Sequence, residues 1–371
     1  MSGIRPLRAD DIGALAALFQ EVFRDPAAPP PASLAAYLRW HYLDMPGCDP
    51  EIAPLVHVEQ DGRISGFIGL NAQAMTYGGR TLRAGIASAL MVSDSAGDKL
   101  AGARLVKAAL AGPQDITLTE TASDVSARMW VGARGALLPQ YSLDWIRVLR
   151  PGSYLVDLAA GRIGAARLLA PLGRGLDRVS GRRAADAGLS WSGLPDGWVG
   201  QGALSAVEID AAAFAALVEP LTEQYPLRPV WREGQLDTLL ACARQKPDWG
   251  ELVLAAASTR GGKPVGAFAY YFRPGHVCRV LQVLALPGQA GPVLDCLLGD
   301  ALRRGVVALR GRTQPALMEA MLGRRVAFVN EATSLVHSRD DALVEACRNG
   351  ALFFNGLAGE YWSRLVGGSF D

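Results

Sequence analysis

One stretch of the sequence has the residue pattern of an anion-binding loop. Residues 84–92 form a nearly unbroken apolar run, which predicts a buried strand, and the small and polar residues 93–97 lead from it into a helix predicted over 98–111. Backbone N–H groups at the start of a helix lack an intrahelical partner, and the helix dipole adds positive potential there. A phosphate or diphosphate would suit such a loop. The alternative is an ordinary strand–loop–helix unit that binds nothing.

The sequence lacks the patterns of metal and hydrolase sites. No two of its four histidines have the spacing of metal ligands, so we expect no metal. The five cysteines are scattered without a CxxC pair, which is typical of a reduced, cytosolic protein rather than of a zinc site or a disulfide framework. No G-x-S-x-G elbow joins a predicted strand to a helix, so hydrolase chemistry has no support.

The composition is that of a globular protein with a substantial core. The chain has 371 residues, of which 50% are hydrophobic and 20% charged, and this length suits two domains. A formal net charge of +1 gives no global attraction to nucleic acid. The N-terminus lacks the apolar core of a secretion signal, and no run approaches the roughly 20 apolar residues of a membrane helix. We therefore expect a cytoplasmic protein without an integral membrane segment, and no nucleic-acid partner.

The elements that must position the loop form an α/β domain in residues 1–150. A strand hairpin turns at the Asp-Gly pair 61–62, which is a strong hairpin signal between two apolar runs. After the loop and helix come a strand at 115–121, a helix at 123–131 and a closing strand at 141–149. The order β-α-α-β-β-β-α-β-α-β-β predicts a mixed sheet flanked by helices.

The second half of the chain repeats the first. The segment VEQDGRISGFIG (58–69) is similar to STRGGKPVGAFA (258–269), and in both a glycine turn leads into a strand that contains Gly66 or Gly266. An internal duplication accounts for the chain length better than two unrelated domains. We therefore predict two domains, residues 1–150 and 203–371.

A basic linker is expected between the two domains, at residues 151–202. Its segment 161–183 contains six arginines and one acid, and Gly and Trp residues follow. One interpretation is a solvated, interrupted helix that connects the domains. The other is a basic lid over an anionic ligand, or a surface attracted to phosphate-bearing lipid.

The order of elements resembles the GNAT (GCN5-related N-acetyltransferase) superfamily. The resemblance rests on the turn and strand DGRISGFIG, the strand–loop–helix ALMVSDSAGDKLAGARL and the helix and turn ASDVSARMWVGARGALL. The segment LRWHYLDMPG resembles a piece of tandem GNAT proteins, some of them linked to polysaccharide or cell-envelope modification. The resemblance covers residues 1–150 well and 203–338 more weakly. It implies two tandem GNAT-like domains, each a mixed, mostly antiparallel sheet flanked by helices, the second one degenerate.

The resemblance also implies a site for acetyl-CoA or another acyl-CoA. In the family the cofactor lies in a splay between the fourth and fifth strands, and its diphosphate sits on the N–H groups of the following loop. Compared with the family loop R/Q-x-x-G-x-G/A, only Gly102 matches, and in the second copy Pro292 removes an N–H donor, which favours the first copy. The residues expected to bind the cofactor are Leu90, Met91, Val92, Gly97, Asp98, Lys99, Leu100, Ala101 and Gly102.

Acyl transfer from a thioester to an amine needs a base for the ammonium group and an acid for the leaving thiolate. Glu120, at the end of the fifth strand, is the candidate base; the alternative is a solvated strand-end carboxylate. The tyrosine that acts as the acid in many GNAT proteins is replaced here by Trp130 or Val131, and the nearest phenol is Tyr141, which could instead be a packed strand residue. Glu360, near the C-terminus, could line a cleft between the copies or simply anchor the chain.

These residues lead to one main hypothesis and two alternatives. The main hypothesis is an acyl-CoA-dependent N-acyltransferase, with acetyl as the expected acyl group, that acts on a small amine or amino sugar. The first alternative is a GNAT-like binding or scaffold protein without transfer chemistry, since the loop matches the family only in part. The second is a Fem-type peptidyltransferase that uses aminoacyl-tRNA, against which the near-neutral charge argues. Fold alone does not decide among them.

Overall fold

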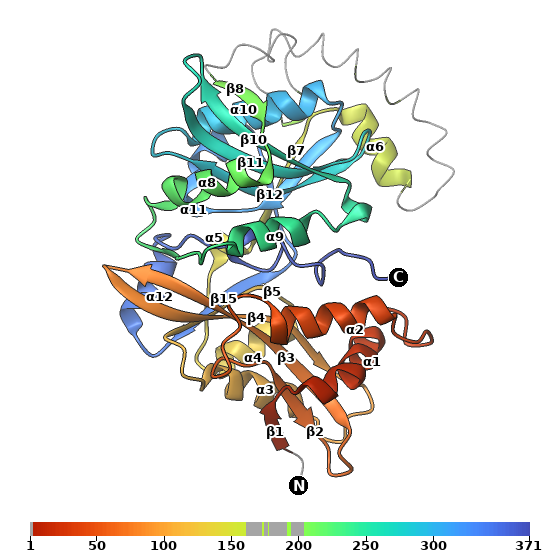
Figure 1. Ribbon diagram of the computed structural model, residues 1–371. Coiled ribbons are helices and arrows are strands. Elements are labelled where there is room, and N and C mark those ends of the chain that lie inside the picture. The colour runs from red at the N-terminus through yellow and green to blue at the C-terminus, as the bar shows by residue number, and fades with distance from the viewer. Residues whose placement is uncertain (1–2, 161–172, 174–176, 178–190, 194–203) are drawn as a thin grey trace.

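The computed structural model describes residues 3–160, 173, 177, 191–193 and 204–371. Figure 1 shows two sheets with their helices, one above the other, and between them the C-terminal segment, residues 349–371. Apart from the isolated positions 173 and 177, the basic segment 161–183 of the predicted linker lies outside the described residues. The division into domains 1–150 and 203–371 therefore stays a prediction.

The first sheet has the strand order β1-β2-β3-β4-β5-β15-β6, with β9 paired to β3 as well. Its turn between β2 and β3 is the predicted hairpin: Gly62 has φ +87°, which glycine adopts without strain, and its N–H donates to the carbonyl of Glu59. The strands are β1 (Gly3–Pro6), β2 (Leu55–Val58), β3 (Ile64–Tyr77), β4 (Arg80–Val92), β5 (Ile116–Ala122), β6 (Ala136–Leu137), β9 (Leu227–Pro229) and β15 (Thr333–Ser338).

The second sheet has the order β14-β7-β13-β12-β11-β10-β8. Side chains of β11 alternate between its two faces: Phe268 and Tyr270 pack into the core on one side, and Tyr271 into the core on the other. The strands are β7 (Leu143–Val148), β8 (Leu204–Glu208), β10 (Glu251–Thr259), β11 (Pro264–Phe272), β12 (Val277–Ala285), β13 (Ala308–Arg312) and β14 (Ala327–Asn330).

Helices cover both sheets, and each sheet contains one parallel strand pair, β4–β5 in the first and β12–β13 in the second. The other pairs between described strands are antiparallel, so the predicted fold class, two mixed and mostly antiparallel sheets flanked by helices, is confirmed. The helices are α1 (Ile12–Phe23), α2 (Ala32–Arg39), α3 (Ala101–Leu110), α4 (Asp124–Gly132), α5 (Pro139–Ser142), α6 (Pro151–Ala160), α8 (Ala211–Thr222), α9 (Gln235–Ala243), α10 (Ala290–Arg303), α11 (Pro315–Gly323) and α12 (Asp341–Arg348).

The two sheets exchange their last strands. The prediction that residues 141–149 close the first sheet is wrong, because this strand, β7, lies between β13 and β14 of the second sheet. In return β15, from the end of the second half, lies between β5 and β6 of the first. A fully buried carboxylate fixes β7 there: Asp144 is 2.7 Å from the guanidinium of Arg310 and 3.2 Å from that of Arg312, both on β13.

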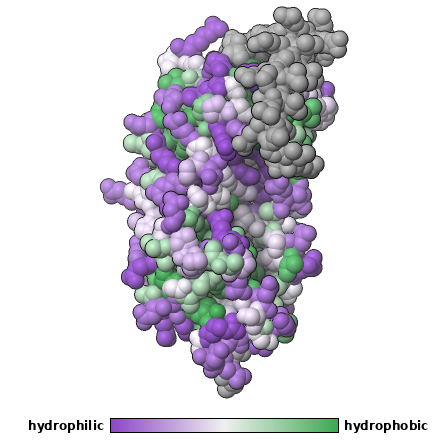
Figure 2. Space-filling view, turned by 90° about the vertical axis from the view of Figure 1, so that its right-hand side faces the viewer, coloured by the Kyte–Doolittle hydropathy of each residue, from purple (hydrophilic) through white to green (hydrophobic). Residues whose placement is uncertain are grey.

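An apolar cluster joins the two halves. Tyr37 and Met45 from the first half pack with Phe353, Leu357 and Trp362 of the C-terminal segment in the same cluster that covers one face of the second sheet. On the face drawn in Figure 2, hydrophilic side chains are spread over both halves, with hydrophobic ones in small groups between them. No helix in the described ranges is long and apolar enough to cross a membrane.

The strand exchange predicts that neither half folds alone. A fragment of residues 1–150 contains β5 without its neighbour β15 and carries β7 without a sheet to join. We expect it to show no cooperative thermal transition by circular dichroism, because its sheet would end in an unpaired edge and lack part of its core. Co-expression with residues 151–371 should give a stable one-to-one complex on size-exclusion chromatography. A sharp melt of monomeric 1–150 would contradict the exchange.

Candidate functional site

The two parallel strands of the first sheet separate part of the way along their length. β4 and β5 pair with each other at residues 84–86 and 116–118. Beyond these residues β4 continues to Val92 and β5 to Ala122, but the two strands no longer pair with each other. The gap that opens between them exposes strand edges toward the space under the C-terminal segment. This is the predicted splay between the fourth and fifth strands.

A bulge in β4 helps to bend it away from β5. Phe67 pairs with Met91 and Gly69 pairs with Ser88. One residue of β3 therefore separates these pairs, whereas two residues of β4 do, so β4 carries the extra residue. The extra residue is accommodated at Ala89, whose φ of 47° is unusual for a residue with a side chain. Gly69 is required at its position, because a Cβ there would collide with the Ser88 hydroxyl and the Tyr42 ring.

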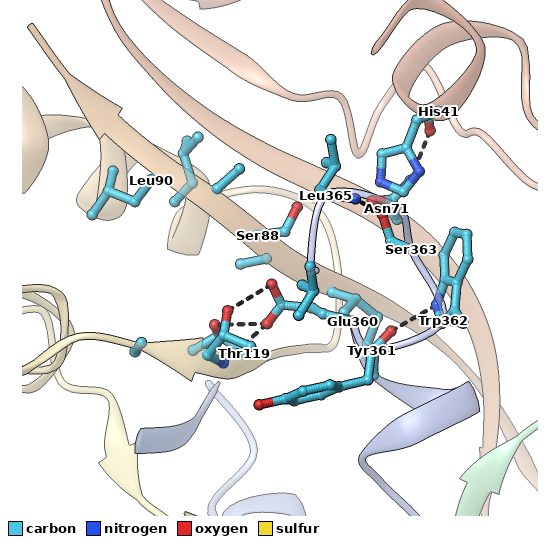
Figure 3. A pocket seen from close by; sticks show the side chains of 18 of the residues that line it. His41, Asn71, Ser88, Leu90, Thr119, Glu360, Tyr361, Trp362, Ser363 and Leu365 are labelled. Atoms are coloured by element: carbon cyan, nitrogen blue, oxygen red, sulfur yellow. Dashed lines mark hydrogen bonds between the residues drawn. The ribbon is translucent and has the colours of Figure 1, made fainter. Parts of the chain in front are cut away.

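A cavity of about 440 Å³ occupies the splay (Figure 3). β3, β4, β5 and α4 of the first half form most of its wall, and α9 and the C-terminal segment of the second half complete it. Among its lining side chains, those of Arg24 and Glu360 are charged. The cavity therefore exists only where the two halves meet.

Glu360 reaches from the C-terminal segment to β5, as Figure 3 shows. Its Oε2 accepts hydrogen bonds from the N–H groups of Glu120 (2.8 Å) and Thr121 (3.1 Å), and its Oε1 accepts one from the hydroxyl of Thr121 (3.0 Å). The side chain is almost completely buried, yet it lines the cavity. Burial raises the pKa of this carboxyl above its usual range, although the hydrogen bonds partly oppose that shift.

Glu120, the predicted base, points to the opposite side of β5. Successive side chains of a strand alternate between faces, so Thr119 and Thr121 line the cavity and Glu120 does not. Its carboxylate accepts the N–H groups of Glu360 (2.6 Å) and Gly356 (3.1 Å). Burial raises its pKa to about 7, partly offset by the positive charge of Arg312. The two glutamates thus hold each other: each carboxylate accepts the backbone N–H of the other residue.

Tyr141, the predicted acid, lies outside the cavity. It is completely buried in the core of the first half, next to Phe354, and its hydroxyl donates to the carbonyl of Leu352 at 2.8 Å. Burial raises the pKa of this phenol further above its usual value. The structure therefore does not bring Tyr141 and Glu120 together at one ligand site.

Neutral polar groups line the part of the cavity where β4 and β5 are still paired. Asn71 lies opposite Ile86 in the β3–β4 register, and Gln73 lies opposite Ala84. The amide of Gln73 accepts a hydrogen bond from Gln235 of α9 at 2.8 Å. His41 also lines this part, and complete burial lowers its pKa to about 3, so its imidazole is neutral at physiological pH.

The nine residues predicted to bind the cofactor lie in different environments. Leu90 lines the cavity, whereas Met91 and Ala101 are buried in the core. Gly102 packs against Met129, whose Cε would lie 3.2 Å from a Cβ at that position. The remaining residues, Val92, Gly97, Asp98, Lys99 and Leu100, do not line the cavity.

Two backbone donors of the loop before α3 are bonded to carboxylates of the protein. The helix predicted from residue 98 begins at Ala101, because the Asp98 carboxylate accepts the N–H of Leu100 at 2.9 Å and holds residues 98–100 in a turn. The N–H of Gly97 donates to the carboxylate of Glu59 at 3.0 Å. Carboxylates of the protein therefore accept two of the N–H groups of this loop, and the prediction that the loop binds a diphosphate stays a prediction.

The equivalent gap in the second sheet is filled. β12 and β13 pair in parallel at residues 277–280 and 308–311, but the C-terminal segment 355–358 then lies between them. Leu357 donates its N–H to Gln282 at 3.1 Å, and Gly356 fits with φ +62° against the carbonyl of Leu281, where a side chain would collide. The cavity left there measures about 10 Å³.

Among the described residues, no group of three or more His, Cys, Asp and Glu side chains could hold a metal ion. The lining of the cavity combines neutral hydrogen-bonding side chains with the ionisable side chains of Arg24 and Glu360. A carboxylate beside a cavity that also admits an elongated ligand is suited to proton transfer during a group-transfer reaction.

Comparison with known proteins identifies the fold. No protein-family model matches the chain, and no curated protein matches its sequence. Solved structures do match. A conserved protein of unknown function from Enterococcus faecalis V583, described as a probable N-acyltransferase, aligns with a TM-score of 0.58 and 9% identity, over 91% of this chain and 72% of that one.

Two further solved structures give the same result. A GCN5-related N-acetyltransferase from Anabaena variabilis aligns with a TM-score of 0.58 and 10% identity, over 92% of this chain and 74% of that one. Another, from Kribbella flavida, aligns with a TM-score of 0.50 and 11% identity, over 92% and 72%. The alignments span both halves of the chain, so the predicted resemblance is confirmed at the level of the fold. The chain has the fold of GCN5-related N-acetyltransferases.

Proposed function

We propose that this protein is an N-acyltransferase that moves an acyl group from a thioester to a small amine inside the cavity between β4 and β5. The observation that carries the proposal is the buried carboxylate of Glu360 in the wall of that cavity. The fold is that of proteins described as N-acyltransferases and N-acetyltransferases, which supports acyl-CoA as the general class of donor and acetyl as the expected group. The donor arm would pass Leu90, the one predicted cofactor residue in the wall.

In this proposal Glu360 is the proton acceptor. Amines are protonated at neutral pH, and a desolvated carboxylate with a raised pKa attracts an ammonium group and can take one of its protons. The neutral amine then attacks the thioester carbonyl, the C–N bond forms, the C–S bond breaks, and the second amine proton leaves with the thiolate. Holding both reactants in one cavity supplies further acceleration. Glu120 keeps Glu360 in place through its backbone N–H and its carboxylate, and takes no part in the proton transfer.

The acceptor is proposed to be a small polar amine, such as an amino sugar. The supporting observation is the set of neutral hydrogen-bonding side chains at the paired end of the strands, contributed by His41, Asn71, Gln73 and Gln235. Amide and imidazole groups can donate to and accept from hydroxyl groups, whereas they offer no charge to a second ionic group. A cytoplasmic location stays a proposal as well, and the five unpaired cysteines support it.

Filling the cavity should abolish donor binding. Ser126 of α4 lines the cavity, and Ser126→Trp would place an indole in the path of the donor. The wild-type protein should gain about 2.7 kcal/mol of stability with acetyl-CoA at 100 times its dissociation constant, whereas the variant should gain none, as measured by calorimetry and thermal unfolding. The matched control is Val125→Trp, because Val125 is the neighbouring residue, is 53% exposed and does not line the cavity.

The same measurement separates the enzyme from a binding scaffold. If the wild-type protein binds neither acetyl-CoA nor acetylpantetheine at millimolar concentration, the proposed function is wrong. If it binds a donor but forms no amide with any of a panel of small amines and amino sugars, the scaffold alternative is favoured.

A further inference from the structure

The cavity reaches both faces of the first sheet. In β3, Phe67 packs in the apolar cluster of α1, and the next residue, Ile68, packs in the cluster of α3 and α4. Successive side chains of a strand point to opposite faces, so α1 covers one face and α3 and α4 cover the other. The lining of the cavity includes Phe19 of α1 and Trp130 of α4. The cavity therefore extends through the splay from one face to the other.

The groups proposed to contact the donor and the acceptor lie on different faces of this sheet. Leu90, which the donor arm is proposed to pass, packs against the cluster of α3 and α4. Asn71 and Gln73 of β3 alternate in step with Phe67, so they share the face that α1 covers. The proposed acceptor contacts are thus on the side of α1.

Arg24, which directly follows α1, adds a positive charge to the cavity wall on this side. Its guanidinium donates to the carbonyl of Gly368 at 2.7 Å, and its Cζ lies 5.8 Å from the ring centroid of Phe19. No carboxylate of the described residues forms an ion pair with it, and the acid one turn earlier, Glu21, accepts the Ser93 hydroxyl instead. A guanidinium has five N–H donors, so Arg24 keeps donors for a ligand.

The charged side chains of the described lining, Arg24 and Glu360, have opposite signs. A ligand with an ammonium group and an anionic group would complement both, and such complementarity is a source of specificity. Carboxylates and phosphates are the anions that the planar guanidinium group binds best, through paired hydrogen bonds.

We propose that the acceptor is an amine that also carries an anionic group, a carboxylate or a phosphate, and that Arg24 binds this group. The inference rests on the proposed function, in which Glu360 takes a proton from the ammonium group of the same molecule. Arg24 then determines which amines are accepted, and takes no part in the transfer itself.

The test compares matched pairs of amines as acceptors of acetyl-CoA with the wild-type protein. The pairs are phosphoethanolamine with ethanolamine, glucosamine phosphate with glucosamine, and β-alanine with β-alaninamide. In at least one pair we expect kcat/KM to be at least about tenfold higher for the anionic member, the lower end of what a hydrogen bond to a charged group contributes. The pair that shows the preference tells whether the anion is a phosphate or a carboxylate.

Variants of Arg24 assign the preference to this side chain. Arg24→Gln should reduce it to about threefold or less, chiefly through a higher KM for the anionic amine, and should leave the neutral amine and the binding of acetyl-CoA within about threefold of the wild type. Arg24→Lys keeps the charge and should retain part of the preference. The matched control is Arg128→Gln, because Arg128 is an exposed arginine of α4 that does not line the cavity.

The outcomes separate this inference from the proposed function. A preference below about tenfold in all three pairs, or one that Arg24→Gln retains, would overturn the inference and leave the proposed function standing. So would a loss of acetyl-CoA binding in Arg24→Gln, since Arg24 would then bind the donor. If no amine of any pair is acylated, the proposed function fails, and the inference fails with it.

Discussion

Replacing Glu360 by glutamine should lower kcat by about 10²- to 10⁴-fold, the range that general base catalysis contributes. The introduced glutamine side chain can still accept N–H groups through its amide oxygen, but it cannot take a proton from the ammonium group. Donor binding should stay within about threefold of the wild type, because the carboxylate is bonded to β5 and the proposal assigns it to the amine rather than to the donor arm. Steady-state kinetics with acetyl-CoA and an accepted amine, together with calorimetry, measure both quantities.

The pH dependence of the reaction separates a proton acceptor from a merely structural residue. In the wild type, kcat should rise with pH through the pKa of Glu360, which burial places above the usual range, and this rise should be absent from the residual activity of Glu360→Gln. Glu319→Gln, which changes an exposed carboxylate on α11, serves as the control and should keep full activity. If Glu360→Gln keeps more than about a third of the wild-type kcat, Glu360 is not the base.

The second large effect concerns stability and Glu120. Its pKa rises from 4.5 in the unfolded chain to about 7 in the folded protein, so the folded state holds this proton more tightly. The contribution is fully present below pH 4.5 and is lost as the pH rises through 7. At about 1.4 kcal/mol per pKa unit, the wild type should lose about 3 kcal/mol of unfolding free energy from this group between those limits.

The measurement must be made as a difference, because other buried groups titrate too. His41 has a pKa lowered to about 3, so its contribution to stability is lost in the opposite direction, as the pH falls below 6.5. Urea unfolding of the wild type and of Glu120→Gln at about pH 4.5 and 7.5 cancels the contribution of His41 and of other groups whose pKa does not depend on Glu120. We expect the advantage of the wild type over the variant to shrink by about 3 kcal/mol at the higher pH. A difference that is constant with pH would contradict the raised pKa.

The sequence predicts where strands and helices lie, but it says less about which strands pair with each other. Apolar periodicity predicts that residues 141–149 form a strand, but it carries no information about which sheet that strand joins. The deciding groups are polar and distant in sequence: Asp144 of β7 meets Arg310 and Arg312 of β13. Such an ion network cannot be predicted from the sequence, because its residues come together only when the two halves pack against each other.

The candidate site shows the same limit. The position of Glu120 at the end of the fifth strand makes it the predicted base, yet strand alternation alone turns it away from the face that Thr119 and Thr121 share. Alternation is thus an available signal for the direction of the Glu120 side chain. The proposed base, Glu360, lies in the C-terminal segment outside any helix or strand, and only its residue types, an acid beside Tyr361 and Trp362, set it apart in the sequence.

The exchanged strands also impose an order on the synthesis of the protein. While a ribosome is still making the second half, the edge of β5 that pairs with β15 is unpaired, because β15 comes far later in the chain. An unpaired edge is a template for wrong pairing, so the nascent first half needs shielding until β15 arrives. The cavity is completed later still, when segment 357–366 emerges. A chain that ends before this segment therefore lacks part of the cavity wall.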